Sequence, residues 1–293
     1  MCANPRAAGP CVDRRWSLGY DAAVLTSIPE YRVSARNTSL HSANKIHDDT
    51  VARRLGFRGG LVPGVTVYAY MTRPILAAFG REWLERGRAA VRFTKPIYEG
   101  EEVTLRAWVT PADPAVLEVQ ALNPAGESCA IATASLTGRD EPSPVDPAAC
   151  PRRDLPVERP PATRAVLESL GVLGSPERLY DDAAAAEYRD KFDDADPLYR
   201  GPGAVVHPAF FLEQGNRAVD QNVRLGPWIH TASEVRHLGG ARVGDRITAR
   251  GRVRRVFEKK GHEFVELDLL LVAGTARPVA NLRHTAIYQL RAS

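Results

Sequence analysis

Ser42-Ala-Asn-Lys-Ile-His-Asp-Asp-Thr50 is the stretch of this chain that decides both its fold and its chemistry. A short Ala-Arg-Arg-Leu pattern typical of a helix follows, and then Gly56-Phe-Arg-Gly-Gly-Leu-Val-Pro-Gly64. Apolar residues with helical spacing occupy positions 65–79, and Pro63 with Gly64 marks the start of that helix. Unpaired N–H groups at a helix start polarise a carbonyl oxygen, so a histidine beside them suits chemistry at a thioester.

This stretch resembles the hydratase motif of the MaoC-like, R-specific enoyl-CoA hydratases, which is Asp-x-Asn-Pro-x-His-x-Asp and belongs to a hot-dog fold. The positions that match the motif, or the glycine that opens the family's central helix, are Asn44, Ile46, His47, Asp49 and Gly64. Two positions depart from it, because Lys45 replaces the proline and Ser42 replaces the aspartate that serves the family as a catalytic base. The resemblance therefore implies the fold, with an altered catalytic dyad.

The resemblance implies roles for individual residues. We expect His47 to act as base or acid and Asn44 to hold the water or orient the ring, while Ser42 can at most orient the water. The predicted substrate-binding residues are Asp49, Pro63, Gly64 and Val65. His41 is a candidate for the second base, and Asp49 is equally explained by capping of the short helix. Restoring the motif with Ser42→Asp is expected to raise simple hydration.

A second part of the chain repeats the first at a constant offset. Residues 99–109 align with residues 243–253, with Gly-x-x-[Val/Ile]-Thr in both, an offset of 144 residues (244 − 100). At the same offset Val62-Pro-Gly64 falls on Val206-His-Pro208, ahead of a second apolar helix. A repeat that holds across separate segments indicates a duplication. His47 falls on Lys191, so the second copy has lost the motif and we expect one active centre, in the first repeat.

The order of elements predicts an α+β fold, a double hot-dog in which each repeat has a long helix wrapped by a curved antiparallel sheet. Strand-like runs lie at residues 31–35, 89–93, 102–110, 116–122 and 129–136, and again at 228–237, 246–257, 263–272 and 279–290. Gly80 is expected to end the first long helix. We expect an N-terminal extension over 1–28, a first repeat over 29–140, a Pro-rich linker over 141–161 and a second repeat over 162–293.

Composition narrows the class of function. A net charge of +4 and the lack of a basic run with interleaved aromatic residues argue against nucleic acid as a partner. We find no apolar run of membrane-spanning length and no secretory signal, which predicts a cytoplasmic protein without membrane contact. The cysteines Cys2, Cys11, Cys129 and Cys150 lack metal spacing and are expected to be free thiols, and no metal or cofactor is expected.

Three functions remain open at this point. The first is a cofactor-free lyase, a hydratase or dehydratase of 2-enoyl thioesters of coenzyme A or of a carrier protein. The second is a non-catalytic protein that binds acyl thioesters, and the third is a thioesterase, because one fold supports several reactions. The presence of both Asn44 and His47 favours the lyase. The resemblance also allows a homodimer of double hot-dogs.

Overall fold

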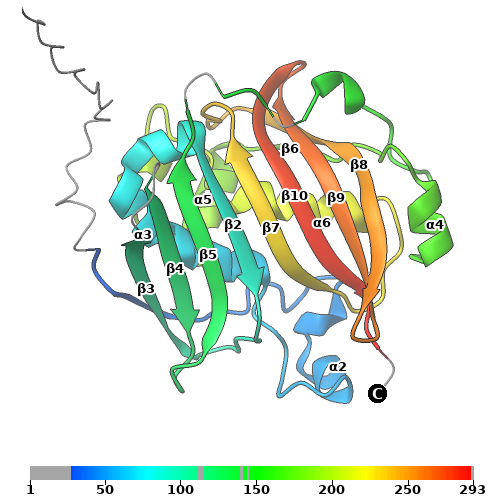
Figure 1. Cartoon of the computed structure of the whole chain (residues 1–293), viewed down its shortest axis with the longest axis horizontal. Helices are drawn as coiled ribbons and strands as arrows, with labels where there is room; N and C mark the ends of the chain where they lie inside the picture. Colours follow the sequence, from blue (N-terminus) through cyan, green and yellow to red (C-terminus); the bar gives the residue numbers. More distant parts are fainter. Residues whose placement is uncertain (1–27, 111–114, 139–140, 144, 292–293) are drawn as a thin grey trace, which may run out of the picture.

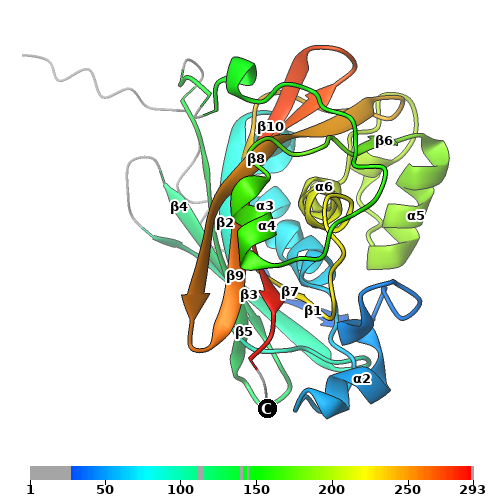
Figure 2. The same cartoon turned by 90° about the vertical axis from the view of Figure 1, so that its right-hand side faces the viewer.

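The computed structural model describes residues 28–110, 115–138, 141–143 and 145–291. Its dominant feature is one ten-stranded antiparallel sheet with the order β1-β3-β4-β5-β2-β7-β10-β9-β8-β6. Helices pack against one face of this sheet, as Figure 2 shows. No helix within the described ranges is long and apolar enough to cross a membrane.

The first half of the sheet comes from the first half of the chain. Its strands are β1 (Tyr31–Ser34), β2 (Gly87–Phe93), β3 (Glu102–Thr110), β4 (Val116–Leu122) and β5 (Ser128–Leu136). Alternation of buried and exposed residues along β2 shows that one sheet face is covered and the other faces outward. Between β1 and β2 lie η1 (Lys45–His47), α2 (Asp49–Arg54) and the long helix α3 (Gly64–Arg86).

The second half of the chain repeats this layout. Its strands are β6 (Glu177–Leu179), β7 (Ile229–His237), β8 (Arg246–Lys259), β9 (His262–Ala273) and β10 (Arg277–Gln289). Its helices are α4 (Arg164–Ser169), α5 (Asp182–Phe192) and α6 (Ala209–Asp220), with the short η3 (Pro197–Tyr199) before α6. The predicted offset holds in space, because β3 and β8 begin at equivalent positions and each follows a positive-φ glycine, Gly100 or Gly244.

The two halves meet along β2 and β7, the middle strands of the sheet (Figure 1). These strands pair antiparallel from Arg88 opposite Arg236 to Arg92 opposite Ala232. Helices α3 and α6 lie side by side on the same face of the sheet, and α5 lies on their far side (Figure 2). The α+β double hot-dog architecture expected from the repeat is therefore confirmed.

Helix α3 is kinked at Gly80, the residue expected to end it. Gly80 has a non-helical φ of 61° and ψ of −159°, and a second helical stretch continues from there to Arg86. Buried side chains surround the helix on most sides, among them Tyr68, Met71, Ile75 and Trp83. A helix with this many apolar faces has to be enclosed, and here the curved sheet and α6 together enclose it.

The second repeat departs from the first where the motif should be. The positions equivalent to Asn44 and His47 are Tyr188 and Lys191, and both lie in α5, an eleven-residue helix. Tyr188 is fully buried and packs edge-on against Tyr180. Because a packed helix replaces the loop, this repeat offers no equivalent of the motif, as its sequence indicated.

The Pro-rich segment expected as a linker makes specific contacts. It contains the short turn η2 (Pro147–Ala149), and Cys150 beyond it is buried against Leu270 and Val272 of β9. Cys129 and Cys150 are free thiols, as expected, whereas Cys2 and Cys11 lie outside the described residues.

Candidate active site

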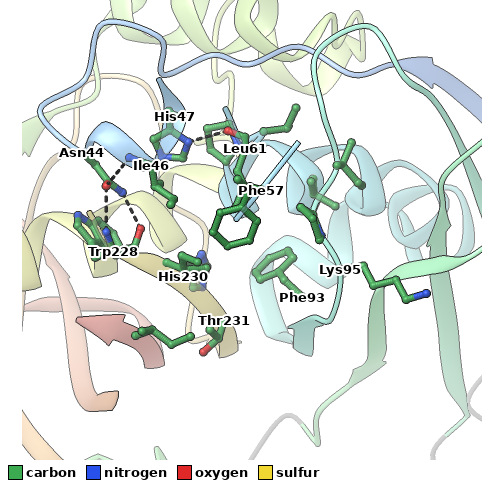
Figure 3. A pocket seen from close by; sticks show the side chains of 18 of the residues that line it. Asn44, Ile46, His47, Phe57, Leu61, Phe93, Lys95, Trp228, His230 and Thr231 are labelled. Carbon is green, nitrogen blue, oxygen red and sulfur yellow. Dashed lines mark hydrogen bonds between the residues drawn. The ribbon is translucent and has the colours of Figure 1, made fainter. Parts of the chain in front are cut away.

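A cavity of about 310 Å³ opens between the two repeats, where the motif loop meets the start of α3 (Figure 3). Its wall is mainly apolar and comes from both halves of the chain. The large apolar side chains that line it are Phe57, Leu61, Phe93, Ile229, Ile287 and Leu290. A volume at the low end of the range for small-molecule sites suits a short acyl group.

Asn44 fixes the motif loop to the second repeat. Its Nδ2 donates to the carbonyl of Trp228 at 2.9 Å, and its Oδ1 accepts from the N–H of Trp228 at 3.1 Å. The same oxygen caps η1 by accepting from the N–H of Ile46. Asn44 lines the cavity, and these contacts use its Oδ1 and one N–H of its amide to hold the motif loop against the second repeat.

His47 lies on the cavity wall, and a hydrogen bond to the backbone determines which of its ring nitrogens carries the proton. Its Nδ1 lies 2.7 Å from the carbonyl oxygen of Leu61. A carbonyl can only accept, so Nδ1 carries the proton and Nε2 keeps a lone pair. Burial lowers the pKa of His47, although the hydrogen bond to Leu61 opposes that shift. The ring is therefore neutral at pH 7 and able to take up a proton.

The start of α3 faces the same cavity. Its cap residue is Pro63, whose side chain cannot accept a hydrogen bond, while its carbonyl accepts from the N–H groups of Thr66 and Val67. The N–H groups of Gly64 and Val65 come before these and are the ones that a ligand could engage. Gly64 has no room for a side chain, because a Cβ there would lie 2.9 Å from the ring of Phe93 and 3.1 Å from Nδ1 of His230. Both Pro63 and Gly64 line the cavity, as predicted for substrate-binding residues.

His230 is one of the polar cavity residues that the motif did not reveal, together with Asn216 and His262. It lies on β7, is 7% exposed, and packs edge-on against Phe93 with ring centroids 4.9 Å apart. Its Nε2 contacts Ser233 Oγ at 2.8 Å and the carbonyl of Ala232 at 3.2 Å. Ser233 in turn contacts Nδ1 of His284 on β10 at 3.1 Å. The only sequence signal for His230 was a histidine in a strand, which more often indicates packing.

Other predicted site residues lie away from the cavity. Ser42 donates its hydroxyl to the carbonyl of Asn44 and is absent from the cavity wall. Asp49 accepts from the N–H of Gly60 and pairs with Arg53, which braces the loop. Val65 is buried in the core. These residues were expected at the substrate, but the loop turns their side chains toward its own backbone or into the core.

Two other histidines, His41 and His207, do not line the cavity. His41 is exposed and does not line the cavity. His207 is fully buried at the head of α6, where its Nδ1 accepts from the N–H of Ala209 and its Nε2 lies 3.3 Å from Asp194. It thus bonds to the first backbone N–H of α6 and does not line the cavity.

Charged groups are sparse around the cavity. Lys95 lines the wall, and Figure 3 shows its side chain extending away from His230, with its ammonium paired to Glu127 at 2.6 Å. Within the described part of the chain, no three His, Cys, Asp or Glu side chains come close enough to hold a metal ion. The polar side chains on the wall include three imidazoles, those of His47, His230 and His262.

Solved structures with the same arrangement are known. A conserved hypothetical protein from Mycobacterium tuberculosis with a double hotdog fold matches with a TM-score of 0.59 and 15% identity, over 89% of this chain and 94% of that one. A protein described as a MaoC domain dehydratase from Chloroflexus aurantiacus matches with a TM-score of 0.59 and 12% identity, over 89% and 94%. This chain is a double hot-dog.

A third solved structure with this fold is described by a different activity. A protein described as a thioesterase from Novosphingobium aromaticivorans matches the double hot-dog with a TM-score of 0.50 and 13% identity, over 91% of this chain and 99% of that one. No family model matches the sequence, and no curated protein does. At these identities the likeness establishes the fold, and the activity has to be argued from the cavity.

Proposed function

We propose that this double hot-dog is an acyl-thioester lyase that adds water to, or removes water from, a short-chain 2-enoyl thioester. The observation that carries the proposal is the hydrogen bond from Nδ1 of His47 to the carbonyl of Leu61. It leaves Nε2 as a base in an apolar cavity beside the free N–H groups of α3. These are the two elements that an enolate-forming reaction requires.

The reaction uses His47 as a proton carrier. As the water oxygen bonds to Cβ, Nε2 takes one water proton, and the double-bond electrons move toward the thioester oxygen. The N–H groups at the start of α3 stabilise that oxygen. The proton then passes from Nε2 to Cα, which restores the thioester carbonyl and the neutral imidazole. Dehydration runs through the same steps in reverse.

The lining and the volume of the cavity limit the size of the acyl group that it can hold. Its apolar wall and small volume favour an unbranched or lightly branched acyl group of a few carbons. The thioester would be carried by coenzyme A or by a carrier protein, and hydrolysis of the thioester is the competing reaction on this fold.

A panel of short 2-enoyl-CoA and 3-hydroxyacyl-CoA esters tests the proposal. We expect loss of the conjugated enoyl thioester without release of free thiol, and His47→Ala should reduce kcat by about 10²–10⁴-fold. His41→Ala is the matched control, because His41 lies outside the cavity, and it should retain full activity. Release of free thiol without hydration would identify a thioesterase, and full activity of His47→Ala would remove His47 from the mechanism.

A further inference from the structure

Nδ1 of His230 is a buried polar atom without a protein partner. No hydrogen bond to it is formed by any residue that the structure describes. The side chain is 7% exposed and lines the cavity, and Nδ1 lies 3.1 Å from the position that a Cβ of Gly64 would occupy. An unsatisfied buried polar atom costs about 1–3 kcal/mol, and a ligand in the cavity that donates a hydrogen bond to Nδ1 would remove that cost.

Nε2, the other ring nitrogen of His230, determines whether a ligand at Nδ1 must donate or accept a hydrogen bond. Nε2 contacts the carbonyl oxygen of Ala232, which can only accept, and so Nε2 carries the ring proton. Nδ1 therefore presents a lone pair to the cavity and can only accept. Burial lowers the pKa of His230 to about 3, which keeps the ring neutral and this lone pair free at physiological pH.

Only some of the groups that take part in the reaction can donate a hydrogen bond to Nδ1 of His230. A 2-enoyl acyl group has a carbonyl oxygen and carbon atoms around the reacting bond, and none of these donates a hydrogen bond. The reacting water does donate, and so does the 3-hydroxyl of the hydrated product. The amide of Asn216 reaches the same cavity, and its Oδ1 is also buried without a partner. A water molecule has two donors, one for the base His47 and one for a single further acceptor, and Nδ1 of His230 is the acceptor that lies beside Gly64 at the start of α3.

We propose that His230 of the second repeat holds the reacting water, or the 3-hydroxyl of the hydrated thioester, through Nδ1. It thereby supplies the second polar partner that Ser42 does not provide in the first repeat. This inference rests on the lyase function proposed above. It makes the active centre composite, with His47 from one repeat and His230 from the other facing one cavity (Figure 3).

The proton balance assigns the two histidines different tasks. One O–H bond of the water breaks and its proton goes to Nε2 of His47, while the second O–H stays intact and donates to Nδ1 of His230. The Cβ–O bond forms, the double-bond electrons pass to Cα, and Cα receives the proton from His47. His230 begins and ends neutral, so it orients the oxygen without exchanging a proton.

Two substitutions at His230 separate this role from a packing role. His230→Asn places an acceptor near the position of Nδ1 but loses the reach to Ser233, whereas His230→Gln keeps that reach and loses the acceptor. We expect kcat for hydration to fall less than about tenfold in His230→Asn and about 10²-fold or more in His230→Gln. Equal losses, or a larger loss in His230→Asn, would overturn the proposal.

A binding measurement keeps the test independent of turnover and of the folding of these variants. The ¹⁵N resonance of His230 Nδ1 is followed in His47→Ala protein as 3-hydroxybutyryl-CoA or butyryl-CoA is added. We expect the 3-hydroxyl compound to shift the resonance and butyryl-CoA to leave it nearly unchanged. The same shift with both, or with neither, overturns the role of His230. Absence of hydration by the unaltered protein would instead refute the lyase function.

Discussion

The side-chain amide of Asn44 and the backbone of Trp228 form a closed pair of hydrogen bonds, one in each direction, across the boundary between the two repeats. Trp228 is buried at the start of β7, two residues before His230. The loop that carries His47 and the strand that carries His230 are therefore held in register by one side chain. Asn44 therefore fixes how the two histidines face each other across the cavity.

Replacement of that amide should loosen the loop. In Asn44→Ala the backbone N–H and carbonyl of Trp228 lose their partner, and we expect a loss of about 1–3 kcal/mol in the free energy of unfolding. Chemical denaturation measures this, and Lys45→Ala, which alters an exposed neighbour, is the control with little expected change. If Asn44→Ala is as stable as the control, the two hydrogen bonds contribute nothing net.

Gly64→Ala should disrupt the cavity. The added Cβ would lie 2.9 Å from the ring of Phe93 and 3.1 Å from His230, so one of these rings has to move. Overpacking of this kind costs about 1–3 kcal/mol, and a displacement of 1 Å can reduce kcat by about 10²-fold. Gly226→Ala is the control, because a Cβ at Gly226 meets nothing within 4 Å. Comparable activity of the two variants would contradict the close packing at Gly64.

The pH dependence of hydration should report His47. Its pKa is lowered from the ordinary value of 6.5, so the neutral, basic form persists to more acidic pH than for an exposed histidine. We expect kcat/KM to be constant near pH 7 and to fall through an apparent pKa below 6.5. A midpoint above 6.5 would mean that a charged partner, rather than burial, dominates the titration of this ring.

Substitutions at Ser42 should have little effect on catalysis. The sequence alone suggested that Ser42→Asp would restore the motif and raise hydration, but the hydroxyl bonds to Asn44 within the loop and Ser42 does not line the cavity. We expect Ser42→Asp to bring no gain, and Ser42→Ala, which lies away from the cavity, to change kcat less than about twofold. A rise of tenfold or more in Ser42→Asp would show that the loop can rearrange to present this position to the substrate.

The buried side chain of His237 should make the folded protein less stable at acidic pH. His237 packs edge-on against Trp83 and Phe211, both ring nitrogens are buried without a partner among the described residues, and burial lowers its pKa to about 3. Its unfolded pKa is higher, so its share of stability is complete above about pH 6.5 and declines as the pH falls toward 3. His237→Phe should reduce that slope by up to about 1.4 kcal/mol per pH unit, measured by denaturation at pH 4 to 7. An unchanged slope would show that His237 is protonated in the folded protein.

The fold was accessible from the sequence because its signals are local and occur twice. Alternation marked the long strands to within a few residues, and the shared Gly-x-x-[Val/Ile]-Thr pattern paired β3 with β8. The break at Gly80 was accessible as well, because glycine adopts the positive φ that interrupts α3 at this position. Helix α5 was not among the predicted elements, although it occupies the positions equivalent to the motif loop.

The candidate site was only partly accessible. The motif led to His47, Asn44 and Gly64, which all reach the cavity. It also led to Ser42 and Asp49, because a sequence motif does not state which way each side chain turns. His230 could not be found in this way, since it enters the cavity from a strand far along the chain and only the pairing of β2 with β7 brings it to Gly64.

The pairing of β2 with β7 has a consequence for how the protein responds to dilution. A cavity assembled from two separate chains disappears when the chains dissociate, so its activity per chain falls at low concentration. Here the two halves belong to one polypeptide and cannot drift apart. The cavity should therefore survive at any concentration at which the chain stays folded, and each half was free to specialise, one toward the proton-transferring loop and the other toward the wall that faces it.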